Sequence, residues 1–340
     1  MSHSTQLRRT CTVGVAMAGA VAMTLTACGG SSTGSGGGVA AVVKGLDNPF
    51  FQSMESGLED QASTDGVEVT VQAANSITDT TGQADKLNGL ANQNFSCFVV
   101  NPITGTNLIQ GVAQLSAKNV PIVNIDSPIE PEAAKAANAK IATYIGTDNE
   151  DAGAKAAAEM ARLLPQGGTV ALIGGTAGDV TSAARLDGFT AAVPANLRII
   201  STVAADWERQ MALTKANDIM TANQELAAFF VANDDMGLGV AQAIANRGKT
   251  GQVKVISVDG NKDAFEAVKS GGLDAVVAQF PYVIGAMGVE ACKAAAAGKT
   301  LPEKVDAPVQ VVTKVNVDAA LSSAPKPAAP YDDPFADLNK

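Results

Sequence analysis

The stretch VAAVVKGLDNPFF, residues 39–51, joins an apolar strand, a polar loop and two adjacent phenylalanines. Residues 39–43 form a short run rich in β-branched side chains, which is typical of a strand buried on both faces. Pro49 suits the first turn of a helix, where its missing N–H costs nothing, so Phe50 and Phe51 are expected at a helix mouth beside the strand end. In a chain that is only 4% aromatic, this pair indicates either a flat apolar face for a ligand or two anchors of the core.

The N-terminus has the layout of a secretory signal, which we expect to occupy residues 1–27. Arg8 and Arg9 precede an apolar run that is too short to span a bilayer comfortably and that ends in LTAC. This ending resembles the processing site of bacterial lipoproteins, in which Cys28 becomes the lipidated first residue. A plain cleavable signal with an incidental cysteine is the alternative. The glycine- and serine-rich residues 28–38 favour a flexible tether, as an anchored domain requires.

The composition is that of a globular chain with a strong acidic balance. The 340 residues, 46% of them hydrophobic, suffice for two domains with real cores. Removing residues 1–27 takes away two of the 24 basic side chains and none of the 34 acidic ones, so the net charge becomes −12. A nucleic-acid partner requires a basic patch, which this composition does not support.

The two cysteines of the folded part give no signal of pairing. Cys97 lies in an apolar strand-like run and Cys292 in a helix-like stretch, and nothing in their spacing indicates a bond. Buried free thiols are therefore favoured, with a disulfide as the alternative.

From residue 39 onward, strand-like and helix-like segments alternate almost without interruption. Repeated right-handed strand–helix–strand units build parallel sheets that are covered by helices on both faces. Residues 128–140 break this rhythm, and a second series starts at 141, which predicts two doubly wound α/β lobes with a boundary near 141. The proline- and aspartate-rich residues 322–340 are expected to be a disordered tail.

Polar residues follow the ends of the predicted strands. Ligands of open α/β sheets bind outside the carboxyl ends of the strands. Carboxylates and amides there pair with vicinal hydroxyls, and aromatic rings cover the apolar face of a sugar. Trp207, the only tryptophan, is a candidate ring from the second lobe, although each polar residue taken alone is equally a turn former or helix cap. The strand-end candidates are Lys44, Asn48, Asn101, Asp126, Asn233, Asp259 and Gln279.

Catalytic interpretations find little support. The only histidine, His3, lies in the predicted signal, so the mature chain has no histidine-containing triad or metal site. The glycine-rich residues 174–178 lack the dinucleotide-binding spacing and read as a tight turn. Asp126 and Asp259 are better explained as hydroxyl acceptors than as the acid pair of a glycosidase. We therefore expect a protein that is not an enzyme and that has no cofactor or metal.

With these residues identified, the chain resembles the periplasmic sugar-binding proteins of the ribose-binding type. The likeness runs from about Val39 to Lys314, and the order of its motifs makes it specific. The motifs are Asp47-Asn48-Pro49-Phe50-Phe51, Asn101-Pro102, Ala184-Arg185, Gly188-Phe189, Asn233-Asp234-Asp235-Met236, Val258-Asp259-Gly260 and Ala278-Gln279.

The resemblance implies a type 1 periplasmic binding fold with three crossovers near residues 142, 279 and 310. The N-terminal lobe would then comprise residues 39–141 and 280–309, and the C-terminal lobe residues 142–279 and 310–321. Phe51 and Trp207 would sandwich a sugar ring. The first lobe would contribute Asn48, Phe50, Phe51, Asn101 and Asp126 to the cleft, and the second Arg185, Trp207, Asn233, Asp259 and Gln279.

Two residues depart from the ribose-binding pattern. Lys44 stands where that pattern has a small hydroxyl residue, and Ser127 stands where it has an arginine. This argues against ribose and leaves another pentose, a hexose or an open-chain polyol. We expect Lys44 to donate to a ligand hydroxyl, with a salt bridge to a neighbouring aspartate as the alternative.

The resemblance implies the extracytoplasmic solute-binding lipoprotein of an ABC importer. It would bind a monosaccharide or polyol, close about the hinge and dock on a membrane permease as a monomer. A ligand sensor that presents a bound sugar to a membrane receptor is the alternative.

Overall fold

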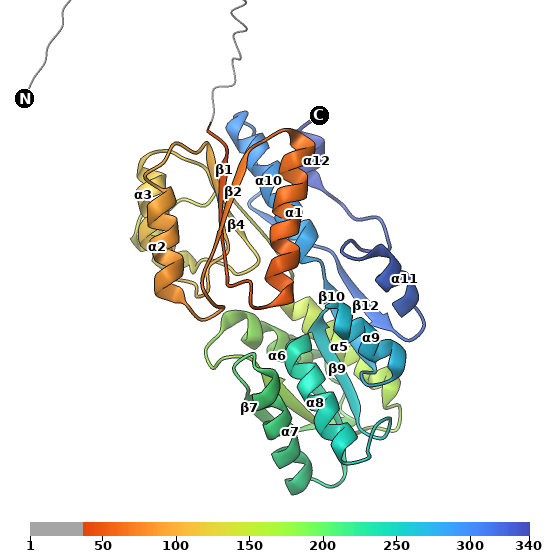
Figure 1. The fold of residues 1–340 in the computed structure, drawn as a ribbon. Helices are drawn as coiled ribbons and strands as arrows, with labels where there is room; N and C mark the ends of the chain where they lie inside the picture. The colour runs from red at the N-terminus through yellow and green to blue at the C-terminus, as the bar shows by residue number, and fades with distance from the viewer. Residues whose placement is uncertain (1–36) are drawn as a thin grey trace, which may run out of the picture. The chain divides into compact units, whose positions relative to one another are not determined.

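The structure is a computed structural model that describes residues 37–340 (Figure 1). The predicted signal peptide, the predicted lipidation site Cys28 and nearly all of the predicted tether lie outside the described residues. The described chain forms two α/β lobes, each built on a six-stranded sheet, which confirms the predicted fold class. Within residues 37–340, no helix has both the length and the apolar character needed to cross a bilayer.

The first lobe contains an all-parallel sheet in the order β11-β5-β4-β3-β1-β2. Helices α2 and α3 lie on one side of this sheet, and α1 and α10 lie on the other (Figure 1). Its strands are β1 (Val39–Val43), β2 (Val69–Ala73), β3 (Cys97–Val100), β4 (Ile122–Ile125), β5 (Thr143–Gly146) and β11 (Lys304–Asp306). Its helices are α1 (Pro49–Asp65), α2 (Thr80–Leu90), α3 (Ile109–Ala117), α4 (Pro131–Ala136), α10 (Pro281–Ala296) and α12 (Pro334–Leu338).

Strand β1 is buried on both faces, as its sequence predicts. Val39, Ala41 and Val43 join the core beneath α1 and α10, while Ala40 and Val42 join the core beneath α2 and α3. Successive side chains of a strand point to opposite faces, so this one strand contributes to two cores. Its carboxyl end is thereby fixed in position, and with it the polar loop that follows.

The second lobe has the sheet order β12-β10-β9-β8-β6-β7, with β12 antiparallel to β10 at one edge. Its strands are β6 (Gly168–Gly174), β7 (Leu197–Ala204), β8 (Leu226–Val231), β9 (Lys254–Asp259), β10 (Ala275–Gln279) and β12 (Val309–Thr313). Its helices are α5 (Asn149–Leu163), α6 (Val180–Ala192), α7 (Arg209–Ala222), α8 (Asp234–Asn246), α9 (Lys262–Ser270) and α11 (Val317–Ser323).

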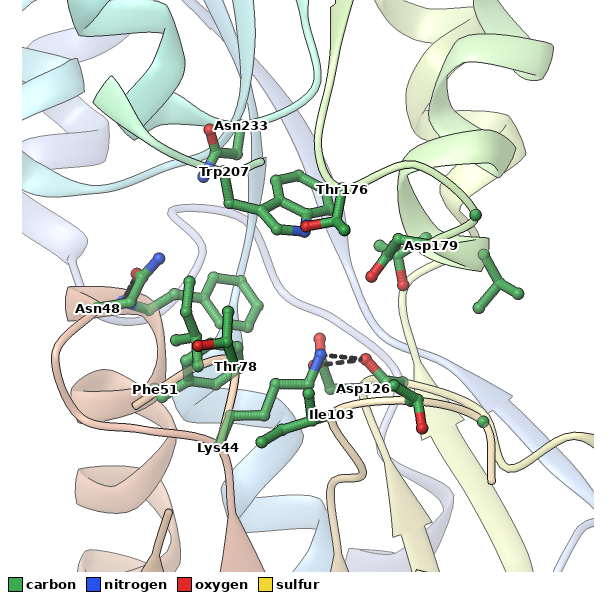
Figure 2. Close-up of a pocket in the computed structure, with 18 of the residues that line it drawn as sticks. Lys44, Asn48, Phe51, Thr78, Ile103, Asp126, Thr176, Asp179, Trp207 and Asn233 are labelled. Carbon is green, nitrogen blue, oxygen red and sulfur yellow. Dashed lines mark hydrogen bonds between the residues drawn. The ribbon is translucent and has the colours of Figure 1, made fainter. Parts of the chain in front are cut away.

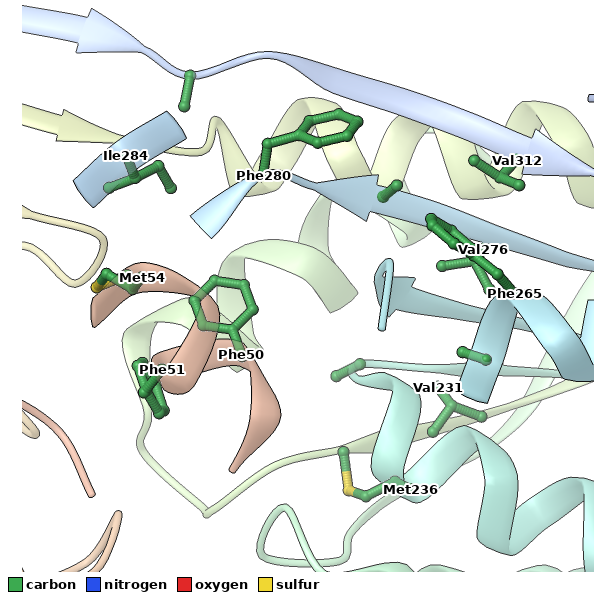
Figure 3. Close-up of a cluster of buried hydrophobic side chains, with 14 of the residues drawn as sticks. Phe50, Phe51, Met54, Val231, Met236, Phe265, Val276, Phe280, Ile284 and Val312 are labelled. Carbon is green, nitrogen blue, oxygen red and sulfur yellow. The ribbon is translucent and has the colours of Figure 1, made fainter. Parts of the chain in front are cut away.

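Three short segments carry the chain between the two sheets. They follow β5, β10 and β11, at residues 147–148, at Phe280 and at residues 307–308. The sequence predicts that the second lobe begins at residue 142, but β5 pairs with β4 and β11 in the first sheet, so the first crossing comes after Gly146. Phe280 is buried in a hydrophobic cluster whose members come from both lobes (Figure 3).

The C-terminal tail is folded, contrary to the prediction of disorder from residue 322. Helix α11 packs on α9, where Lys269 and Asp318 form an ion pair of 2.7 Å. The chain then returns to the first lobe, where α12 packs on α10 and Phe335 is fully buried. The composition suggested disorder because the tail is rich in proline and acidic residues. Burial of the Phe335 ring against the first lobe nevertheless stabilises a folded arrangement.

Cys97 and Cys292 form a disulfide, with 5.5 Å between their Cα atoms. The expectation of free thiols is therefore wrong. The two residues are 195 positions apart in sequence, and they meet because α10 returns from the second lobe to pack on β3. Sequence spacing carries no trace of that return, so it gave no signal of the bond.

Candidate functional site

The carboxyl ends of the strands in both lobes face one cavity of about 340 Å³ (Figure 2). This volume lies within the range of about 300 to 1,000 Å³ that is common for small-molecule sites. The cavity is lined by nine of the eleven candidate residues, which are Lys44, Asn48, Phe50, Phe51, Asp126, Arg185, Trp207, Asn233 and Asp259.

The start of α1 forms the aromatic part of the first lobe's wall. Asn48 is the N-cap residue, and its Oδ1 accepts a hydrogen bond of 2.9 Å from the backbone N–H of Phe50. Phe50 and Phe51 meet edge to face, with 5.2 Å between ring centroids. Figure 3 shows both rings at the first turn of α1, and Figure 2 shows Phe51 among the residues that line the pocket. The cap therefore fixes the turn that presents the ring.

Lys44, Ser127 and Asp126 form a polar chain on the same wall. Lys44 Nζ donates to Ser127 Oγ at 2.7 Å, and Ser127 Oγ donates to Asp126 Oδ2 at 3.3 Å. Lys44 Nζ also lies 5.4 Å from the centroid of the Phe51 ring. No ion pair among residues 37–340 includes Lys44, so the alternative of a salt bridge with a neighbouring aspartate is not realised.

Asp126 adopts an unusual backbone conformation, with φ at 59°. Non-glycine residues rarely occupy this left-handed region, although aspartate does so more often than most. The Tyr144 hydroxyl donates a hydrogen bond of 2.6 Å to the Asp126 carbonyl oxygen. Tyr144 therefore anchors the backbone that turns the Asp126 carboxylate into the cleft.

Trp207 supplies the aromatic group of the second lobe (Figure 2). Its φ is 66°, and its indole lies directly over Gly175. A Cβ atom on Gly175 would stand 2.1 Å from the indole ring, so only glycine allows the ring to occupy this place. The glycine-rich residues 174–178, which the sequence suggested to be a tight turn, thus also make room for the cleft aromatic.

The charged pair of the second lobe is Arg185 and Asp259, at 3.3 Å and almost fully buried. Arg185 is held from two further sides, since it donates to Asn149 Oδ1 at 2.8 Å and to the Ala232 carbonyl at 2.6 Å. Gln279 Nε2 donates to Asp259 Oδ1 at 2.9 Å. Burial raises the pKa of Asp259 to about 6, although Arg185 opposes the shift.

Asn101 and Gln279 are the two candidates that do not line the cavity. Asn101 is fully buried, with its carbonyl accepting from Gln83 Nε2 at 2.8 Å and its Nδ2 against Met54 Sδ. Gln279 reaches the site through Asp259. Asn101 directly follows β3 and Gln279 is the last residue of β10, and neither side chain is part of the cavity lining.

Three lining segments were missed by the sequence analysis, at residues 77–80, 103–105 and 176–181. They follow β2, β3 and β6, so they obey the same strand-end rule. The candidates were chosen there as acids, amides and aromatic residues, whereas these segments contribute mainly Thr, Ile and Gly. A listing of every residue after every strand would have found them.

The ionisable side chains of the cavity carry both signs of charge. Lys44 and Arg185 contribute two positive charges, and Asp126, Asp179 and Asp259 contribute three negative ones. A cleft with paired acceptors, paired cations and two aromatic faces can hold a neutral molecule with several hydroxyl groups. A strongly anionic ligand would add to the net negative charge of this lining, which disfavours it.

Comparison with known proteins gives consistent results. The sequence profile of the periplasmic binding protein domain matches residues 39–300. The chain is 38% identical over 267 residues to the D-allose-binding periplasmic protein of Escherichia coli, covering 77% of this chain and 86% of that protein. It is 32% identical over 272 residues to a ribose import binding protein of Bacillus subtilis, covering 80% of this chain and 86% of that one.

The fold also matches solved structures. One is an ABC transporter periplasmic solute-binding protein of Actinobacillus succinogenes with bound D-allose. It aligns with a TM-score of 0.79 and 27% identity, covering 83% of this chain and 99% of that one.

Proposed function

Because the chain belongs to the periplasmic binding protein family, and similar proteins include a D-allose-binding protein, a ribose import binding protein and an ABC transporter solute-binding protein with bound D-allose, we propose that it captures a monosaccharide or sugar alcohol outside the cytoplasm for import. The observation that carries this proposal is one cleft in which Phe51 and Trp207 come from opposite lobes together with paired acids and cations. The D-allose bound by two similar proteins makes a hexose of this kind the first ligand to test.

The residues of the cleft have distinct roles in this proposal. Phe51 and Trp207 cover the apolar faces of the ring, Asp126 and Asp259 accept from ligand hydroxyls, and Lys44 and Arg185 donate to ligand oxygens. A hydrogen bond to a charged group contributes about 1.5 to 3 kcal/mol, so loss of Asp259 is expected to weaken binding about tenfold or more.

The two lobes close on the ligand about the three crossing segments. Ligand contacts from both lobes exist together only in a closed arrangement, so binding favours closure through those contacts. The closed protein then docks on an ABC permease as a monomer.

The chain is held at the membrane by lipid on Cys28. β1 begins at the end of the first lobe that is remote from the cleft, because its carboxyl end faces the cleft (Figure 1). A tether that joins there leaves the cleft open to solvent. Mass spectrometry of the membrane-extracted protein tests this: the expected mass includes a diacylglyceryl group on Cys28, and a Cys28→Ser variant is expected to be released from the membrane.

The ligand is tested by thermal shift across pentoses, hexoses and polyols, followed by calorimetry on the best ones. A ligand at a hundred times its Kd stabilises the folded state by about 2.7 kcal/mol, which raises the melting temperature measurably. We expect at least one neutral carbohydrate to do so, and we expect Asp259→Ala to reduce the shift at the same ligand concentration. A shift with charged solutes only would contradict the proposal.

A further inference from the structure

Asp234 is a carboxylate that is completely buried, yet it does not line the cleft and has no cationic partner within residues 37–340. It occupies the first turn of α8, directly after the cleft residue Asn233. Burying an unpaired carboxylate is costly unless hydrogen bonds compensate for the lost water. Burial raises its pKa well above the ordinary value. The buried Asp234 carboxylate therefore requires hydrogen-bond partners that compensate for the lost water.

Three hydrogen-bond donors compensate the Asp234 carboxylate. Its Oδ1 accepts from Ser257 Oγ at 2.5 Å, and its Oδ2 accepts from the backbone N–H groups of Gly260 and Asn261 at 2.7 and 2.8 Å. Both amides belong to the turn that follows β9. A partly buried N–H that lost this acceptor would remain unsatisfied wherever water cannot replace it, at a cost of up to about 1 to 3 kcal/mol.

The same turn carries Asp259 in a strained conformation. Its φ is 135°, in the region that side chains rarely adopt, and φ of the next residue, Gly260, is 92°. Such a conformation persists only where the surroundings hold it. Asp234 binds the backbone immediately after the strained residue, and it directly follows Asn233.

We infer that Asp234 is a positioning residue for the cleft, whose carboxylate holds the backbone of residues 259–261 so that Asp259 faces the ligand. The inference rests on the proposed function, because ligand affinity is its main readout. Asp234 acts on the ligand through Asp259, so its removal and the removal of Asp259 are not independent.

A double-mutant cycle on affinity tests this, with D-allose, D-ribose and xylitol as probes and the tightest one used throughout. We expect Asp234→Ala to weaken binding about tenfold or more, since it removes the acceptor of both N–H groups that hold the turn after Asp259. In a background of Asp259→Asn, the same change is expected to cost less than about threefold, which is the signature of coupled residues. Additive losses, or parent-like affinity of Asp234→Ala, would overturn the inference.

Rescue by the isosteric side chain separates positioning from charge. In Asp234→Asn the amide oxygen can still accept from both backbone groups, and the amide nitrogen can donate to Ser257 Oγ. This variant is expected to recover most of the affinity. A loss as large as that of Asp234→Ala would overturn the positioning role.

The matched control lies at the other end of β9. Asp274 accepts from the backbone N–H of Val255 at 2.9 Å and from Lys254 Nζ at 3.1 Å, so it also fixes this strand but at the end remote from the cleft. Asp274→Ala is expected to lower the melting temperature and to leave affinity unchanged. An affinity loss equal to that of Asp234→Ala would assign both effects to general destabilisation and overturn the inference.

Hydrogen exchange tests the positioning role of Asp234 without any ligand. The amides of Gly260 and Asn261 are expected to exchange slowly in the parent and much faster in Asp234→Ala. If the parent binds none of the three probes, the proposed ligand class fails, and unchanged exchange at these two amides still overturns the inference. If Asp234→Ala does not fold, Ser257→Ala is measured instead. We expect the amides of Gly260 and Asn261 to exchange faster in that variant than in the parent. Parent-like exchange would overturn the inference.

Discussion

Lys44 and Ser127 are joined by a hydrogen bond of 2.7 Å, although they lie 83 positions apart and follow different strands. These are the two residues that depart from the ribose-binding pattern. Their contact means that the departures are coupled: the positive charge absent after β4 is supplied from the end of β1. The ammonium group of Lys44 therefore lies on the first lobe's side of the cavity, beside the Phe51 ring, and is contributed by the loop after β1 instead of the loop after β4.

This contact predicts that Lys44→Ala weakens binding of the cognate carbohydrate. The expected loss is about tenfold or more, because a charge-assisted hydrogen bond contributes about 1.5 to 3 kcal/mol. Calorimetry measures it, and Ser127→Ala is the control, with a smaller loss because it removes only the neutral partner that orients the ammonium group. Unchanged affinity and enthalpy for Lys44→Ala would exclude a ligand contact.

Ligand affinity is expected to depend on pH through Asp259. The carboxylate form accepts hydrogen bonds from ligand hydroxyls, and burial raises its pKa in the free protein to about 6. Affinity should be constant at pH 7 to 8 and fall below about pH 6, by at most about tenfold per unit of pH. Calorimetry across this range checks it. In Asp259→Asn the weaker affinity should show no inflection near pH 6; the same inflection in both proteins would assign the titration to another group.

Gly175 is predicted to control the position of Trp207. A methyl group in Gly175→Ala would collide with the indole, so the ring must leave its place and binding is expected to weaken about tenfold or more, as when an aromatic anchor is lost. Because Trp207 is the only tryptophan, its fluorescence reports the displacement directly, before any ligand is added. Gly178→Ala is the control in the same loop, since its added methyl meets no atom within 4 Å, although the φ of 83° makes it mildly strained. An unchanged emission spectrum in Gly175→Ala would refute the prediction.

The sequence predicted those features that depend on local pattern. Alternating strands and helices predicted both sheets, and the strand-end rule brought Lys44, Asp126 and Asp259 to one cavity although they come from three separate strands. What it missed depends on contacts between distant segments. The family resemblance placed residues 280–309 in the first lobe, but neither it nor the local pattern indicated that Cys292 on α10 would meet Cys97 on β3.

The role of Asp234 and the space above Gly175 were hidden for a related reason. Asp234 stood in a motif of the resemblance and Gly175 in a glycine-rich run, but the role of each depends on the residues that contact it. Asp234 meets a turn 26 positions later in sequence, and Gly175 meets an indole from another strand end. The residue types alone suggest a helix cap or a turn. The contacts in the folded chain show that Asp234 also binds the turn after β9 and that Gly175 also leaves space for the indole.

The folded tail predicts a pH-dependent docking of α12. Burial raises the pKa of Glu290 on α10 from its ordinary 4.5 to about 8, with the nearby Asp333 as a further cause; Asp65 and Tyr331 also face it, and Lys293 opposes the shift. An acid with a raised pKa binds its proton more tightly in the folded state, so its contribution to stability is complete below about pH 4.5 and is lost as the pH rises to about 8.

Hydrogen exchange of residues 334–339 should therefore speed up between about pH 4.5 and 8 beyond the intrinsic increase of amide exchange with pH, with no further excess above about pH 8. Glu290→Gln keeps the neutral shape and should remove the excess. Phe335→Ala empties a fully buried site, so it should undock α12 at every pH, because a buried phenylalanine contributes about 3 to 5 kcal/mol. If Glu290→Gln retained the same excess, the docking would depend on another group, and Asp333→Asn at the N-cap of α12 would be the next variant to compare.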